Sequence, residues 1–87
     1  MEKGLSVFIG AVTDEKLATG EVTKRILKIG GVERVYELTG DFDVLIFARS
    51  GSVTELNRIV EAIRAAQGVI SSTTYLVLDT HSTRGHE

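Results

Sequence analysis

The sequence predicts an α+β fold with a four-stranded antiparallel sheet and two helices on one face of it. An internal repeat is the first observation, because the second half of the 87-residue chain copies the apolar pattern of the first. The order within each half is the second: a β-type run is followed by helical spacing, a glycine and another β-type run. Two βαβ units in tandem give the βαββαβ order of the ferredoxin-like fold. The matched pairs of the repeat are Val7 and Val44, Ile9 and Ile46, Ala11 and Ala48, Ile26 and Ile63, Gly31 and Gly68, and Val32 and Val69.

The first half of the chain supplies a strand, a helix and a second strand. Apolar residues from Leu5 to Val12 predict the first strand. Thr13 or Asp14 is expected to cap the helix, and Gly31 lies just past its end, where a left-handed residue closes the last turn. The helical spacing is carried by Ala18, Val22, Ile26 and Ile29.

The second half repeats this order with a clearer helix start. The run from Phe42 to Ala48 predicts a strand, and Ser52 with Glu55 after it forms a capping box. The apolar helix positions that follow are Val53, Leu56, Val60 and Ile63, with Gly68 past the end. Four consecutive hydroxyl residues, Ser71 to Thr74, occupy the last strand. Because both central strands of the fold are apolar, this polar strand is expected at an edge of the sheet.

Alternation along the strands divides the sheet into two faces. Repeat-matched residues such as Val7 and Val44 are expected to face the helices, because equivalent positions meet equivalent partners. The opposite face, called the outer face below, then carries an apolar patch, which predicts a homodimer packed sheet against sheet. A ligand-lined face is the alternative. The expected outer-face residues are Phe8, Val12, Leu45, Phe47, Ile70, Leu76 and Leu78, joined by Tyr36 and Leu38 if the hairpin loop is two residues long.

Size and composition limit the class of protein. A chain of 87 residues is one domain, expected over residues 1–79, with a polar and disordered tail over residues 80–87. Cysteine is absent, which excludes disulfides and thiolate sites, and a net charge of -2 offers no footprint for nucleic acid. The chain has neither a signal-peptide core nor an apolar run of membrane length, so a soluble cytoplasmic domain is expected.

Catalytic and metal-binding groups are not expected. His81 and His86 lie in the polar tail, and no histidine elsewhere could activate a serine or threonine as a nucleophile. The glycines at 30 and 31 belong to a helix-to-strand turn rather than a phosphate loop. Acylphosphatases share the fold but need an arginine at the first strand-to-helix turn, where this chain has Thr13, Asp14 and Glu15. We therefore expect a non-enzymatic protein without metal or cofactor.

A short acidic bend from Thr39 to Asp43 joins the two halves of the repeat. Carboxylates occur at Glu37, Asp41 and Asp43, whereas residues 35–48 contain no Lys or Arg. The glycine in the bend supplies the positive φ of a hairpin turn. A hairpin needs no anionic tip in order to turn, so the charge indicates a function.

Asp43 is the carboxylate most in need of a partner. It is expected on the outer face beside apolar residues, where burial of an unpaired charge is costly. The candidates are Arg34, Arg49, a backbone amide and the ammonium group of a ligand, and the ligand is favoured. Hydroxyls of Ser72 and Thr74, expected on the same face, can also bind a small polar molecule.

These residues together resemble the ligand-binding module of the Lrp/AsnC family of regulators, also called the RAM domain. The resemblance covers Leu5 to Leu78 and is most specific at the Gly-Asp-Phe-Asp bend. Further matches are Gly31-Val32 leading to Val35-Tyr36, and Gly68-Val69 leading to Tyr75-Leu76-Val77-Leu78.

The resemblance implies how the module assembles and what it binds. Such modules dimerise through their sheets, and the dimers form tetramers, octamers or larger rings, so an octamer or decamer is conceivable here. Amino acids or similar effectors bind at contacts between dimers. The implied effector-site residues are Gly40, Asp41, Phe42, Asp43, Ser72 and Thr74.

The chain departs from the family pattern in one respect. Regulators of this family carry a helix-turn-helix domain before the module, whereas this chain opens on the first strand. A stand-alone module without direct DNA binding is therefore expected, acting with a full-length Lrp/AsnC regulator or with an enzyme.

Two other readings of the fold remain open. A dimeric α+β barrel enzyme, such as a monooxygenase or isomerase, would need a cavity lined with His, Asn, Arg or Trp, and this sheet offers neither His nor Trp. An amino-acid-binding ACT-type module would pair its sheets side by side and place a glycine where this chain has Thr13 and Asp14.

Overall fold

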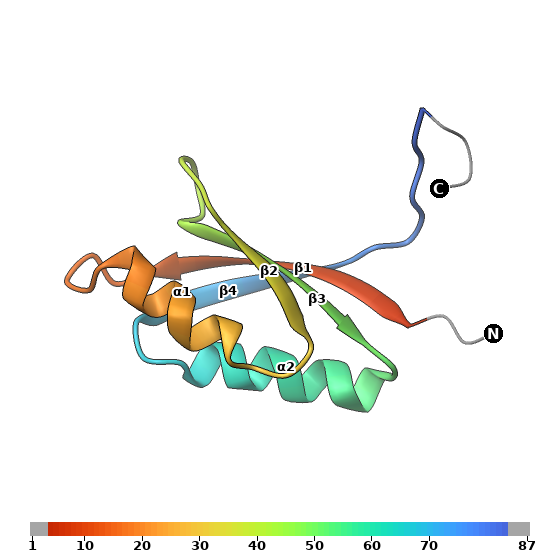
Figure 1. Ribbon diagram of the computed structural model, residues 1–87, viewed down its shortest axis with the longest axis horizontal. Helices are drawn as coiled ribbons and strands as arrows, with labels where there is room; N and C mark the ends of the chain where they lie inside the picture. The colour runs from red at the N-terminus through yellow and green to blue at the C-terminus, as the bar shows by residue number, and fades with distance from the viewer. Residues whose placement is uncertain (1–3, 84–87) are drawn as a thin grey trace.

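A computed structural model describes residues 4–83 of the chain. One antiparallel sheet in the order β2-β3-β1-β4 is covered on one face by both helices, as Figure 1 shows. The elements are β1 (Leu5–Thr13), α1 (Thr19–Leu27), β2 (Val32–Glu37), β3 (Val44–Ser50), α2 (Val53–Ala65) and β4 (Val69–Leu76). The predicted fold is confirmed, and so is the edge position of the hydroxyl-rich strand β4.

The core lies between the sheet and the helices and follows the internal repeat. Val7, Ile9 and Ala11 of β1 are fully buried, as are their repeat partners on β3, Val44, Ile46 and Ala48. Val22 and Ile26 of α1 and Ile59 and Ile63 of α2 complete the buried set. Each buried Val or Ile side chain contributes about 1.5–3 kcal/mol of transfer free energy. The prediction that the repeat-matched residues face the helices is confirmed.

The two helices begin differently. At α2 the hydroxyl of Ser52 accepts a hydrogen bond from the backbone N–H of Glu55 at 3.1 Å, and the Glu55 carboxylate accepts one from the N–H of Gly51 at 2.9 Å. The predicted capping box is therefore confirmed, with its return bond one residue earlier than the usual pattern.

The predicted cap of α1 is wrong. That helix begins at Thr19 after Ala18, which makes no side-chain capping bond. The carboxylate of Asp14 instead accepts a hydrogen bond from the N–H of Lys16 at 2.9 Å in the preceding turn. Asp is well suited to such a local turn, and its side chain is used there, five residues before the helix begins.

Glycines end both helix-to-strand turns, as predicted. Gly31 and Gly68 have φ angles of +100°, a conformation that side-chain-bearing residues rarely adopt. A Cβ atom on Gly68 would lie 2.6 Å from a methyl carbon of Val22. The glycine thus allows the turn and also lets the turn pack closely against α1.

Bulges in both edge strands determine which side chains reach the outer face. In β2 the register changes between Val32 and Arg34, and in β4 it changes opposite Val12 and Thr13, so that Ile70 is the additional residue. One inserted residue moves every later side chain of a strand to the other face.

The bulge in β4 makes part of the sequence prediction wrong. Ser72, Thr74 and Leu76 pair with Ala11, Ile9 and Val7, and therefore lie on the helix side of the sheet. The residues of β4 on the outer face are Ser71, Thr73 and Tyr75, which pair with Val12, Gly10 and Phe8. The outer-face predictions for Phe8, Leu45 and Phe47 agree with the pairing, as does that for Tyr36, which is opposite Leu45. Ile70 is the bulge residue and has no partner on β1.

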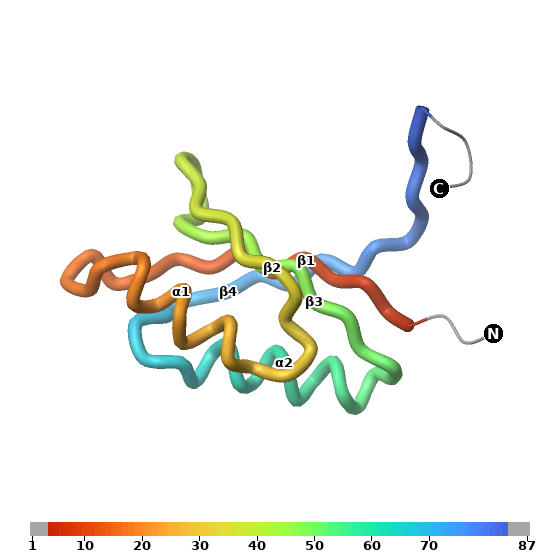
Figure 2. Tube along the Cα trace, in the orientation of Figure 1, coloured from red at the N-terminus to blue at the C-terminus, as the bar shows by residue number. Residues whose placement is uncertain are grey.

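The chain leaves the sheet after β4. The N–H of Val77 still donates to the carbonyl of Ser6 at 2.9 Å, and the following segment runs away from the sheet in Figure 2. Leu78 on this segment is 91% exposed, and it does not join the outer-face patch. Part of the predicted tail, including His86, lies outside the described residues. Within residues 4–83, neither helix has the length and apolarity to span a membrane.

Candidate functional site

The outer face of the sheet has an aromatic centre. The rings of Phe8 and Phe47, on neighbouring strands, lie 5.0 Å apart between centroids. The guanidinium groups of Arg34 and Arg49 lie 5.7 and 5.6 Å from the centroid of the Phe47 ring. Tyr36 remains 41% exposed on the same face, where its hydroxyl accepts a hydrogen bond from Arg34 at 3.1 Å. The outer face therefore exposes apolar and aromatic surface that one copy of the chain does not cover.

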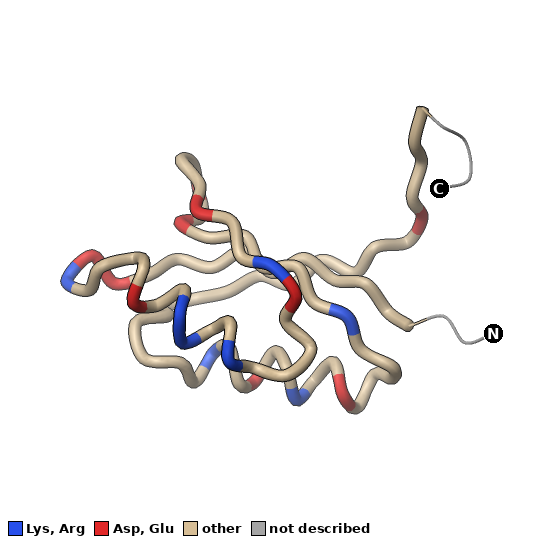
Figure 3. The backbone as a smooth tube through the Cα atoms, in the orientation of Figure 1, with Lys and Arg blue, Asp and Glu red and all other residues tan. Residues whose placement is uncertain are grey.

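The acidic hairpin rises from the end of this face. Its loop is longer than two residues, because the strands end at Glu37 and Val44. The N–H of Leu38 donates to the carbonyl of Asp43 at 2.9 Å, so Leu38 and Asp43 lie opposite each other at the base of the loop. Gly40 at the tip has a φ angle of +137°, as predicted for the turn. Figure 3 shows acidic positions but no basic ones on the loop between β2 and β3, whereas basic positions occur on both of these strands and along the helices.

Asp43 is bound to the end of the neighbouring strand. Its backbone N–H donates to the carbonyl of Ala11 at 2.9 Å, and its carboxylate Oδ2 accepts a hydrogen bond from the N–H of Thr13 at 2.8 Å. Thr13 is only 7% exposed, so the carboxylate takes the place of a strand partner for a buried amide. Of the four partners predicted for Asp43, the one found in the structure is a backbone amide, that of Thr13.

The two arginines that were candidate partners are engaged elsewhere. Arg49 forms an ion pair with Glu33 at 3.4 Å, and Arg34 donates to Tyr36. Asp43 is half-buried and uses one carboxylate oxygen for Thr13. Its second oxygen has no hydrogen-bond partner within residues 4–83 and can still accept one.

Phe42 anchors the hairpin to the sheet. Its ring lies directly over Gly10 of β1, where a Cβ atom would be 2.5 Å from Cδ2 of the ring. The ring also contacts Tyr75 of β4 edge-on, with centroids 6.4 Å apart. Neither Gly10 nor Tyr75 was predicted as part of the site, although a glycine inside a β-rich run signals close approach of another group.

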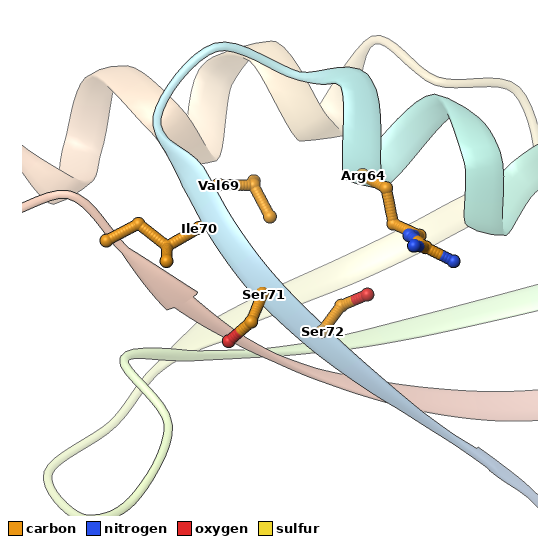
Figure 4. Close-up of a pocket in the computed structure, with 5 residues that line it drawn as sticks. All are labelled: Arg64, Val69, Ile70, Ser71 and Ser72. Carbon is orange, nitrogen blue, oxygen red and sulfur yellow. The ribbon is translucent and has the colours of Figure 1, made fainter.

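Ser72 lines a separate pocket at the edge of the sheet. The pocket has a volume of about 370 Å³ and is lined by Arg64, Val69, Ile70, Ser71 and Ser72. Figure 4 shows Ser72 on the same side of β4 as Arg64 and Val69, with Ile70 and Ser71 turned to the other side. Ser72 and Thr74 are thus not on the same face as Asp43, whereas Ser71 and Thr73 are.

Groups suited to metal binding do not gather in the described part of the chain. Residues 4–83 contain no cluster of three or more His, Cys, Asp or Glu side chains with metal-binding geometry. His81 lies 3.7 Å from the carboxylate of Asp79, and both side chains are exposed.

Known proteins similar to this chain include regulators and an enzyme. The HTH-type transcriptional regulator LysM of Saccharolobus solfataricus is 36% identical over 80 residues, which are 92% of this chain and 56% of that protein. The chain thus spans about half the length of the regulators it matches. The homocitrate synthase of Sulfolobus acidocaldarius is 41% identical over 76 residues, which are 87% of this chain but only 16% of the enzyme.

The fold and the family agree. A feast or famine regulatory protein from M. tuberculosis, solved in complex with L-methionine, has a TM-score of 0.77 to this chain at 25% identity and covers 94% of it, the match being 56% of that protein. The pattern of the Lrp/AsnC ligand binding domain matches residues 6–86. Since this match takes in almost the whole sequence, the chain belongs to the Lrp/AsnC ligand-binding domain family.

Proposed function

We propose that this domain senses a free amino acid and reports its presence through assembly with other protein chains, without catalysing a reaction. The observation that carries the proposal is the acidic hairpin of a Lrp/AsnC ligand-binding domain, fixed to a sheet face that exposes apolar surface. The L-methionine complex of the M. tuberculosis regulator supports an amino acid as the class of effector.

The hairpin carboxylates are suited to the ammonium group of the effector. Asp41 is exposed at the tip, and Asp43 is half-buried with one carboxylate oxygen used for Thr13. The N–H groups around Gly40 can donate to the effector carboxylate. Phe42, whose ring packs on Gly10 of β1, holds these residues close to the sheet.

The hydroxyl groups of β4 take two places in the proposed site. Ser71 and Thr73 share the outer face with the hairpin and can bind the effector of the same copy. Ser72 and Thr74 lie on the other side of β4 and can reach an effector only at a contact with a neighbouring copy.

We also propose a homodimer formed through the outer face, with dimers joined into a larger ring. Coverage by a second sheet would bury Phe8, Phe47 and Tyr36, which one chain leaves partly exposed. Interfaces of standard size bury about 800 Å² on each partner, and apolar surface of this kind is typical of them. Effector binding between dimers would then change the assembly.

The partner that reads the signal is proposed to be a full-length Lrp/AsnC regulator. LysM contains a matching region within a longer protein. An enzyme is the second candidate, because a matching region also occupies 16% of a homocitrate synthase. Pull-down of each class of partner with and without amino acid would separate these two candidates.

The effector is tested by thermal unfolding of the protein with each standard amino acid. A ligand at a hundred times its dissociation constant stabilises the folded state by about 2.7 kcal/mol, which raises the Tm of a domain this small by about 10 °C or more. Asp41→Asn and Asp43→Asn are expected to weaken the stabilisation. Glu21→Gln, on an exposed position of α1, is the matched control and keeps it. Absence of any shift with the unmodified protein would exclude an amino-acid effector.

A further inference from the structure

Phe42 connects the acidic hairpin to two strands that are not part of it. A Cβ atom on Gly10 of β1 would lie 2.5 to 2.7 Å from three carbons of the Phe42 ring, which is closer than side chains can approach. On β4 the ring meets Tyr75 edge-on, at an interplanar angle of 72°. Because Gly10 has no side chain, β1 has a notch at this position, and the Phe42 ring lies in it. We call this packing of Phe42 on Gly10 the seat.

The position of Asp43 depends on this seat. Asp43 follows Phe42 directly, and its carboxylate reaches Thr13 at 2.8 Å only while the hairpin lies close to β1. The tip of the hairpin has no comparable support, because nothing lies within 4 Å of a Cβ atom on Gly40. Displacement of the ring would therefore move the carboxylates away from the sheet.

We propose that Phe42 is a positioning residue for the effector site and that Gly10 is the residue that makes this possible. The inference rests on the proposed function, and it changes the role expected for Phe42 from contacting the effector to orienting Asp41 and Asp43. A hairpin held in one position binds more tightly than one that must be ordered on binding, since the ordering cost is already met.

The seat also links effector binding to dimerisation. Phe42 and Tyr75 lie on the outer face, so a second copy that covers this face also holds the ring in its notch. Two binding events that favour the same conformation strengthen each other by the same factor. Effector is therefore expected to tighten the dimer, and loss of the seat removes this dependence.

The test is a double-mutant cycle of Gly10→Ala and Phe42→Ala. Calorimetric titration with each standard amino acid measures affinity, and hydrogen exchange at the N–H of Thr13 reports the hairpin position without any ligand. Gly10→Ala is expected to raise the dissociation constant and the exchange rate at Thr13 by about tenfold. In the Phe42→Ala background, Gly10→Ala should change neither the dissociation constant nor the exchange rate at Thr13, because no ring remains to be displaced. Gly20→Ala, at a helical glycine with nothing within 4 Å, is the control and alters neither quantity.

The outcomes separate the inference from the proposed function. If the unmodified protein binds an amino acid and Gly10→Ala binds it equally well, the positioning role is wrong and the proposed function stands. If the unmodified protein binds no amino acid, the proposed function fails and the positioning role fails with it. Should Gly10→Ala not fold, Phe42→Ala alone decides, because unchanged affinity and unchanged exchange at Thr13 would overturn the inference.

Discussion

Asp43 combines a structural bond with a proposed binding role in one carboxylate. Oδ2 satisfies the buried N–H of Thr13 at the point where β1 and β3 stop pairing. The remaining oxygen has no hydrogen-bond partner within residues 4–83, and we propose that it binds the effector ammonium. Substitutions at this residue must therefore be chosen so that loss of the structural bond is not mistaken for loss of binding.

Asp43→Ala and Asp43→Asn separate the two roles. Alanine leaves the Thr13 N–H unpaired in a position that is 7% exposed, so the free energy of unfolding is expected to fall by about 1–3 kcal/mol. Asparagine keeps an acceptor oxygen for that N–H and loses only the charge, so its stability should remain close to that of the unmodified protein. Urea unfolding of the three proteins measures the difference. Equal losses for both variants would show that the charge itself, rather than the hydrogen bond, stabilises the hairpin.

At the scale of single residues, the sequence predicts that Asp43 has a partner but does not identify that partner. Alternation places Asp43 beside apolar residues, and a carboxylate there must be satisfied. The choice between an arginine, an amide and a ligand depends on where two strands stop pairing, which no local pattern encodes. The notch at Gly10 is similar: the glycine is visible in the sequence, but the ring that fills it comes from another element.

Among the elements, α2 has the better-defined start, and its cap is open to a direct test. Ser52→Ala removes the acceptor for the Glu55 N–H and is expected to lower the free energy of unfolding by about 1 kcal/mol. Thr54→Ala changes an exposed residue of the same first turn and serves as the control. Chemical denaturation followed by circular dichroism measures both. Equal stability of Ser52→Ala and the control would mean that the cap contributes nothing.

Strand β4 shows where element-level prediction fails. The bulge at Ile70 reverses the faces of all later residues, so Ser72 and Thr74 were placed on the wrong side of the sheet. Strand β2 has a bulge at the repeat-equivalent position, Glu33, which also becomes visible only in the structure. Strict alternation from Val69 overlooks the bulge in β4, since a bulge leaves no signature in polar residues such as these.

Adjacent lysine substitutions on β4 test both the bulge and the dimer. Thr73 lies on the outer face opposite Gly10, and Thr74 lies on the other face opposite Ile9. Thr73→Lys is expected to convert the proposed dimer to monomer, because it places a charge inside the interface. Thr74→Lys, one residue away and exposed, is expected to leave the dimer intact. Light scattering at micromolar concentration gives the mass of each variant. A dimeric Thr73→Lys protein together with a monomeric Thr74→Lys protein would mean that β4 has no bulge at Ile70.

The whole molecule exposes more surface than a compact monomer of its size. Its accessible surface is 6035 Å², against about 5000 Å² expected from its mass of 9.4 kDa. The radius of gyration of 13.5 Å likewise exceeds the value of about 12 Å for a compact chain of this length. The segment after β4 runs away from the sheet, and the uncovered outer face exposes Tyr36 and Tyr75, so both add accessible surface.

Burial of this face against a second copy predicts how assembly responds to a single charge. Leu45→Asp introduces a carboxylate between Tyr36 and Gly10 in the middle of the face, where a dimer would bury it without a partner. We expect a mass of one chain, 9.4 kDa, for this variant and twice that or more for the unmodified protein. Val53→Asp is the control, because Val53 is an equally apolar residue, 65% exposed, at the start of α2 on the opposite side of the sheet. Circular dichroism establishes that both variants remain folded. A monomeric unmodified protein, or a Leu45→Asp protein that still assembles, would contradict a dimer formed through the outer face. In the second case the edge strands would be the remaining surface for self-association.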